Sequence, residues 1–306
     1  MGLFSKDYES SGSGISKDDV KKKGLALFFD LLGRKFWSLM WVNVLYVLFF
    51  IPLMLIMPAI YFINNNYIAV AVICILVLIF AIVIGPATAG MMKIMRMFYI
   101  EKHTFIAHDF FEAVRDNFKR AAVVGLVDCF VIFSAFAALQ VYPALAVQYT
   151  RAFYIPMVIT FSLFLMVFIM NFYVFLMLTS TTLTMKQILK NSFMFAISGM
   201  KQNLLTVGVI VAIMFIMSLL FLNLFQVFAL LIPIFPAAFI GFVVCFNCYP
   251  LIQKNVLDPF YSMQGKVNPE YLDGSEDDDT EQIFEDMGGK EAPIEKRKKS
   301  KGKVIK

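Results

Sequence analysis

The chain has 306 residues, of which 60% are hydrophobic, and its mean hydropathy is +0.75. This apolar share is well above that of a soluble domain, so the composition excludes an ordinary water-soluble fold. The formal net charge is +5, but the basic residues flank long apolar stretches and do not form one basic domain, which argues against a nucleic-acid partner. Membrane lipids are the expected surroundings.

Six apolar stretches are long enough to cross a bilayer, because a helix needs ~20 residues to span ~30 Å of hydrocarbon. A polar arm, residues 1–23, precedes them. We predict an all-α fold, a polytopic membrane bundle of about six helices in three hairpins, within residues 24–264. The predicted spans are, in chain order and to within a few residues, 37–62, 67–91, 121–146, 153–178, 204–224 and 228–249.

The charges outside these spans are distributed unequally. Before Gly265, every Lys and Arg except Arg151 lies before the first span, in an even-numbered connection or after the sixth span. The odd-numbered connections hold no Asp or Glu. Positively charged connections stay cytoplasmic during insertion. We therefore expect a multi-pass membrane protein with both termini in the cytoplasm.

Three segments on the basic side have the spacing of amphipathic helices that lead directly into a span. Their apolar residues recur every three or four positions within 25–36, 106–118 and 185–200. The first two align without a gap, Phe28 to Phe36 over Phe110 to Phe118, which favours repeated units of an inner helix followed by a hairpin. Such helices lie in the headgroup plane or pack beneath the bundle.

The chain turns polar at about Gly265. An acidic block (276–279) and a basic block (296–301) follow, with few residues that could form a core. We predict that residues 265–306 form a disordered, charged cytoplasmic tail.

Asp128 is the most informative polar residue, because it lies about two turns into the third predicted span. An ionisable group at the centre of a membrane helix costs ~2.5–3.5 kcal/mol on insertion scales. Asn43 in the first span and Asn171 in the fourth are the possible polar partners. The three residues are our candidate intramembrane site, in which Asp128 either exchanges a proton or links helices as a neutral hydrogen-bonding group.

A second motif, Gly85-Pro86-Ala87-Thr88-Ala89-Gly90, closes the second span. Gly85 with Ala89, and Pro86 with Gly90, place small residues one turn apart, which permits close helix approach. Pro86 lacks a backbone donor and should bend the helix. Close packing is the favoured interpretation, and a kink that faces a ligand is the alternative.

The sequence offers no recognisable catalytic motif. The two histidines, His103 and His108, lie in one connection without an HExxH pattern, and Asp128 has no carboxylate partner within the spans. We therefore expect no enzyme activity, no catalytic residues, no metal site and no cofactor.

Residues 24–255 resemble the YesL family of bacterial integral membrane proteins. The resemblance is carried by Phe28-Phe29, by Gly85-Pro86-Ala87-Thr88-Ala89, by Asp109-Phe110-Phe111 through Asn117-Phe118-Lys119-Arg120, and by Leu183 to Asn191. The family has no settled biochemical activity, so the resemblance supplies no site residue. Its genes commonly neighbour those of sugar ABC importers, which implies a role in carbohydrate uptake.

Two functions remain open at this stage. The first is a non-enzymatic accessory subunit of an ABC-type carbohydrate importer, whose partners would be a sugar permease and membrane lipids. The second is a stand-alone transporter or channel for small solutes that uses Asp128.

Overall fold

The computed structural model describes residues 24–271, and all regular structure within this range is helical. Six helices in this described part of the chain are long and apolar enough to cross a membrane, which confirms the predicted all-α membrane bundle. The chain divides into two units, 1–267 and 268–306. Only a turn at Asn268 to Tyr271 is described in the second, so the arm 1–23 and most of the predicted disordered tail lie outside the described residues.

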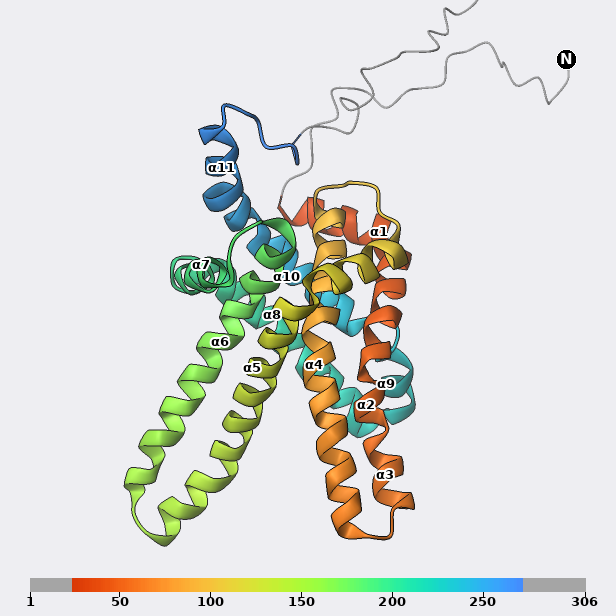
Figure 1. Ribbon diagram of the computed structural model, residues 1–306, viewed down its shortest axis with the longest axis vertical. Helices are drawn as coiled ribbons and strands as arrows, with labels where there is room; N and C mark the ends of the chain where they lie inside the picture. Colours follow the sequence, from red (N-terminus) through yellow and green to blue (C-terminus); the bar gives the residue numbers. More distant parts are fainter. Residues whose placement is uncertain (1–23, 272–306) are drawn as a thin grey trace, which may run out of the picture. The chain divides into compact units, whose positions relative to one another are not determined.

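The first half of the chain forms two long hairpins (Figure 1). Asn65 ends the first turn and caps the next helix, since its side chain accepts hydrogen bonds from the amides of Tyr67 and Ile68 at 3.0 and 3.3 Å. The helices are α1 (Leu25–Val47), η1 (Leu48–Phe50), α2 (Ile51–Met54), α3 (Ile56–Phe62), α4 (Asn66–Tyr99), α5 (Ile106–Gln148), η2 (Arg151–Phe153) and α6 (Tyr154–Ser180).

The second half is more irregular. A capping box of Thr184 and Gln187 starts α7, and Gly199 separates it from α8. The helices are α7 (Met185–Ser198), α8 (Met200–Asn223), α9 (Phe225–Leu231), α10 (Pro236–Ile252), η3 (Gln253–Leu257) and α11 (Asp258–Met263).

The sixth predicted span, 228–249, is broken in the structure. The helix stops after Leu231 and restarts at Pro236, and α10 then continues through η3 and α11. Prolines at 233 and 236 explain the break, because neither can donate the backbone hydrogen bond that a continuous helix needs. The first span is also segmented, at η1 and at Leu55, beside Pro52 and Pro58.

Two of the three amphipathic segments are the first turns of longer helices. Residues 25–36 belong to α1 and 106–118 to α5, and only the third segment forms the separate helix α7. Most aligned pairs in the two stretches have the same burial: Leu31 and Ala113 are buried, and Phe29 and Phe111 are exposed. The first pair differs, because Phe110 is fully buried and Phe28 only half-buried. This agreement supports the interpretation of these stretches as equivalent parts of a repeat.

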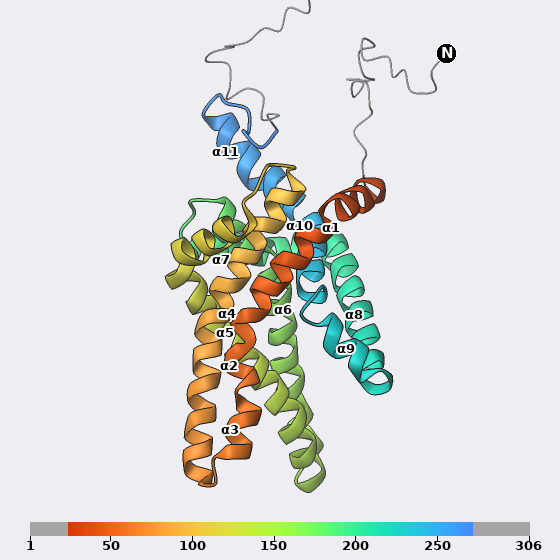
Figure 2. The same cartoon turned by 90° about the vertical axis from the view of Figure 1, so that its right-hand side faces the viewer.

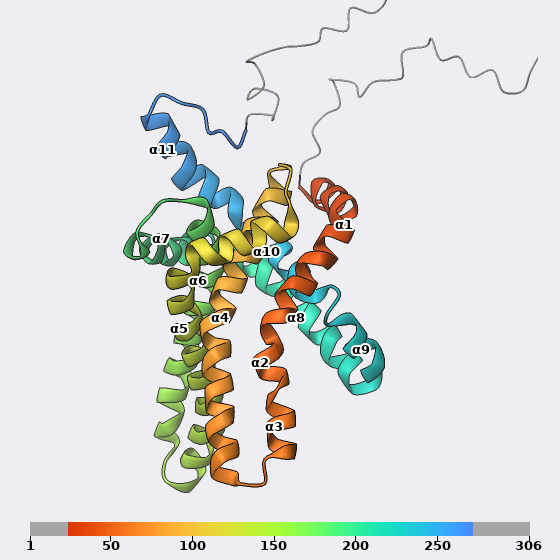
Figure 3. The ribbon, with the colours of Figure 1, turned by 45° about the vertical axis from the view of Figure 1, so that its right-hand side comes forward.

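The segments expected on the cytoplasmic side lie at one end of the first unit. The start of α1, the α4–α5 connection, α7 and α11 share this end, and the α3–α4 and α5–α6 turns lie at the other (Figures 1 and 3). We call the end that holds the start of α1, the α4–α5 connection, α7 and α11 the basic end. The buried core lies near it, around Tyr173, Phe242 and Tyr249, whereas α2, α3 and α9 contain no buried residue.

The closest contact between helices joins α4 to α5. A Cβ added at Gly85 would lie 2.0 Å from the Ala121 carbonyl oxygen, and one at Gly125 would lie 2.8 Å from the Ala81 carbonyl oxygen. A Cβ at Gly90 would meet the Phe110 carbonyl oxygen at 2.9 Å. Ala89 is also buried, and α4 remains one helix through Pro86. Gly85 and Gly90 of this motif thus pack α4 directly against the backbone of α5.

Gly85→Ala should destabilise the protein by about 1–3 kcal/mol, because the added methyl group meets backbone that cannot rotate away. Gly208→Ala in α8 is the matched control, since a Cβ there meets nothing within 4 Å. The melting temperature in detergent should fall for the first variant and stay level or rise slightly for the second. Equal melting temperatures would contradict a backbone-to-backbone contact.

Candidate functional site: polar groups within the apolar helices

Asp128 pairs with Asn171. The Asn171 Nδ2 donates to Asp128 Oδ1 at 2.7 Å, which joins α5 to α6, and both side chains are half-buried. Asp128 lies about one turn beyond Gly125, the glycine at which α5 contacts α4. The pair holds one titratable group. It can therefore exchange a single proton or serve as an interhelical link.

Asn43 serves a different purpose from the one we considered for it. It is fully buried, its Nδ2 donates to the Ile232 carbonyl at 2.9 Å, and its Oδ1 accepts from the Ala238 amide at 2.9 Å. Those two backbone groups lie on either side of the break between α9 and α10. One asparagine thus satisfies both, as a break at membrane depth requires. Of the two possible partners of Asp128, the structure selects Asn171.

Sequence reasoning missed a buried polar network near the basic end. The Tyr173 hydroxyl donates to Asn203 Oδ1 at 2.6 Å, and Asn203 Nδ2 donates to the carbonyls of Phe195 and Ala196 at 3.1 and 3.0 Å. These bonds join α6, α7 and α8 and satisfy the last carbonyls of α7. The one feature of the sequence that pointed to this network was the position of Asn203 beside an apolar span.

The same network continues to α10. Asn247 Nδ2 donates to Thr206 Oγ1 at 3.0 Å, and Cys248 Sγ lies 3.9 Å from that hydroxyl. Cys245 and Cys248 form no disulfide, and both are fully buried. The Cys-x-x-Cys pair therefore packs as two small core residues, in agreement with its position in an apolar span.

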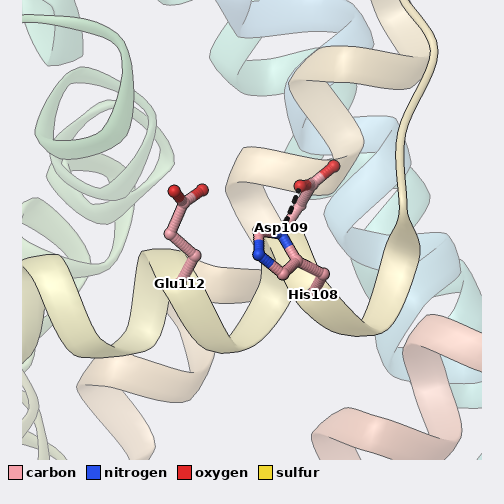
Figure 4. Close-up of side chains that lie close together, drawn as sticks. All are labelled: His108, Asp109 and Glu112. Atoms are coloured by element: carbon pink, nitrogen blue, oxygen red, sulfur yellow. Dashed lines mark hydrogen bonds and ion pairs between the residues drawn. The ribbon is translucent and has the colours of Figure 1, made fainter.

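One group of side chains has the composition of a metal site. His108, Asp109 and Glu112 offer ligand atoms within 4.8 Å of one another on the first turns of α5 (Figure 4). Each carboxylate already has an internal role: Asp109 accepts from the Phe105 amide at 2.9 Å, and Glu112 pairs with Lys93 at 2.5 Å. Lys93 also lowers the pKa of the Glu112 carboxyl by hydrogen bonding and charge. The cluster is exposed and has no buried unpaired ligand atom, so we assign it no metal.

A groove opens at the basic end between α7 and the α10–η3–α11 segment. Its volume is about 630 Å³, and its wall combines apolar side chains with a few polar ones. Met194, Phe260 and Met263 in its wall are at least half exposed. The remaining lining residues are Asn191, Phe195, Ser198, Leu251, Lys254, Asn255, Val256 and Pro259. We call this the basic-end groove.

Residues 39–141 match a family described as "Protein of unknown function, DUF624". The matched part covers the end of α1, all of α4 and most of α5, including Asn43, the Gly85 motif and Asp128. Neither the curated proteins nor the solved structures yield a match.

Asn43→Ala should destabilise the protein, because it leaves both the Ile232 carbonyl and the Ala238 amide without their hydrogen-bond partner. One unsatisfied buried polar group costs roughly 1–3 kcal/mol, so the loss should be at least about that large. Asn223→Ala is the control, because Asn223 is exposed and bonds only to the Leu219 carbonyl of its own helix. Thermal unfolding in detergent measures the difference. A melting temperature equal to that of the control would show that Asn43 does not hold the break.

Proposed function

We propose that the protein is a non-enzymatic integral membrane subunit that assists an ABC-type carbohydrate importer in a bacterial plasma membrane. The carbohydrate-uptake role in this proposal comes from the resemblance of residues 24–255 to the YesL family. The matched family of residues 39–141 is described only as one of unknown function. In this proposal the protein binds the sugar permease and does not itself recognise the sugar.

The observation that carries the proposal is the basic-end groove. Large apolar side chains exposed outside the hydrocarbon region mark surfaces for protein contact. Met263 is 87% exposed and Phe260 is 50% exposed, and both follow the last apolar helix on the side of the basic connections. Lys254 adds a positive charge to the wall. A partner helix with apolar and acidic side chains would complement this groove.

Co-purification tests this proposal. The tagged wild-type protein, extracted in mild detergent, should retain a sugar permease, and Phe260→Glu or Met263→Glu should reduce the retained amount at least tenfold. Phe105→Glu is the control, because Phe105 is 70% exposed at the same end but does not line the groove. Absence of a permease from the wild-type preparation, or equal recovery with all three variants, would reject the assignment.

The alternative is a stand-alone transporter, and two observations favour it. The Asp128–Asn171 pair supplies a titratable group between α5 and α6, and Asn43 supports a broken helix within the apolar region. Discontinuous helices form the binding sites of many transporters.

Asp128→Asn separates the two functions. The amide matches the shape of a protonated carboxyl and can still accept from Asn171, so the fold should persist. If Asp128 only joins helices, Asp128→Leu should melt at a lower temperature than Asp128→Asn, because it leaves Asn171 without its partner. Purified wild-type protein in liposomes should move no labelled mono- or disaccharide. Sugar flux by the wild type that Asp128→Asn abolishes would establish the transporter instead.

We further propose that the basic end faces the cytoplasm, because Lys and Arg concentrate there. Cysteines introduced at Asn65 and Gln148 should react with an impermeant thiol reagent on intact cells, and a cysteine at Ser262 should react only after lysis. The parent chain is the control, since its own cysteines lie within α4, α5 and α10. The reverse pattern of labelling would invert the topology.

A further inference from the structure

A second groove lies within the apolar part of the bundle, and it is separate from the basic-end groove. Its volume is about 840 Å³. The helices α6 and α8 form its walls and diverge from each other away from α7 (Figure 2), while α4 and α10 form its floor. We call it the intramembrane groove. The wall on α6 runs from Phe164 to Phe175, and the wall on α8 runs from Val207 to Ser218.

The length of the intramembrane groove matches one leaflet. Each wall extends over 11 residue steps, which at 1.5 Å per residue is about 16 Å. Half of a ~30 Å hydrocarbon core is about 15 Å. The groove starts near the basic end, where α8 begins and α6 finishes, so it lies within the leaflet on the side of α7.

The wall of this groove is mostly apolar, and its few polar side chains already donate hydrogen bonds within the protein. Only three of its residues carry polar groups able to bond a solute, and each donates within the protein: Thr88 to the Ile84 carbonyl at 2.8 Å, Ser218 to the Phe215 carbonyl at 2.7 Å, and Asn171 to Asp128 at 2.7 Å. A sugar would need donors and acceptors directed into the site. The groove therefore suits an apolar chain and does not suit a polar solute.

The shape of the wall also disfavours a transmembrane helix as the occupant. Helices in membranes approach one another through small residues. Here the walls carry Phe and Met side chains, and the one glycine, Gly241, lies on the floor beneath Met91, whose Sδ would lie 3.3 Å from an added Cβ. Long, flexible side chains adapt to an acyl chain more readily than to a helix backbone.

Exposed lysines lie beyond the end of the groove that faces the basic end. Lys201 lies on α8 about 9 Å, six residues, before Val207, the first lining residue of that helix. Lys186 and Lys190 lie on the neighbouring α7, and all three are exposed. Basic residues at this depth attract anionic headgroups.

We propose that the intramembrane groove is a lipid-binding site that holds one acyl chain of an anionic phospholipid, with the phosphate near Lys201. The site would retain a structural lipid between α6 and α8, two helices that otherwise diverge. This inference does not depend on the importer proposal or on which side of the membrane is cytoplasmic.

Native mass spectrometry of the full-length protein in mild detergent tests the site. After delipidation, added phosphatidylglycerol should bind the wild type at one molecule per chain, and phosphatidylcholine should bind more weakly. Met214→Trp and Val211→Trp fill the groove from an exposed position and should each reduce phosphatidylglycerol binding at least tenfold. Ile216→Trp is the control, because it lies on the same helix at the same depth but outside the groove.

The melting temperature provides a second measurement and checks that the variants fold. Phosphatidylglycerol should raise it for the wild type and for Ile216→Trp, and should leave it unchanged for the two filled variants. Lys201→Gln should remove the preference for phosphatidylglycerol over phosphatidylcholine.

Three results would overturn the proposal. These are equal phosphatidylglycerol binding by Met214→Trp and the wild type, no binding by the delipidated wild type, and a wild-type dimer or bound polypeptide that Met214→Trp dissociates. The last result would assign the groove to protein contact.

Discussion

The contact between the backbones of α4 and α5 sets the geometry of much of the bundle. Gly85 and Gly125 have no side chain to separate the two helices, and each glycine lies against the carbonyl of an alanine on the other helix. In lipid, apolar side chains gain little from burial against each other, so close backbone packing and hydrogen bonds must supply the association energy. Polar residues one turn away link these two helices to others: Thr88 lies within hydrogen-bond distance of Tyr46 on α1, and Asp128 accepts from Asn171 on α6.

Polar residues supply the second kind of link, and their locations separate structural from functional candidates. Asn43 satisfies two backbone groups at a helix break, and Asn203 satisfies the end of α7. Both are almost fully buried and have obligatory partners. Asp128 differs because it is only half-buried and its partner Asn171 also lines the intramembrane groove. A change in its protonation would alter the α5–α6 link without breaking a backbone bond, which keeps it as the candidate for a functional role.

The sequence predicts the features that depend on local pattern. The apolar length of the spans and the small residues at Gly85 and Ala89 follow from periodicity and residue type. Features that depend on distant partners do not follow. Asn43 bonds across about 190 residues to Ile232 and Ala238, which no spacing rule reveals. The break before Pro236 was predictable in principle from the two prolines, but the continuous apolar run around them favoured one uninterrupted span.

The two grooves divide the molecule by chemistry. The basic-end groove combines apolar side chains with Lys254 and amide groups outside the hydrocarbon, where water makes apolar burial favourable and a protein partner gains affinity from it. The intramembrane groove has no such driving force, since an acyl chain leaves one apolar environment for another. Its selectivity must come from packing against Phe and Met side chains and from Lys201, which lies on α8 beyond the end of the groove. A lipid held there would fix α8 relative to α6, and α8 begins directly after α7, which forms one wall of the basic-end groove. Lipid composition could in this way influence the surface on which a partner protein would bind.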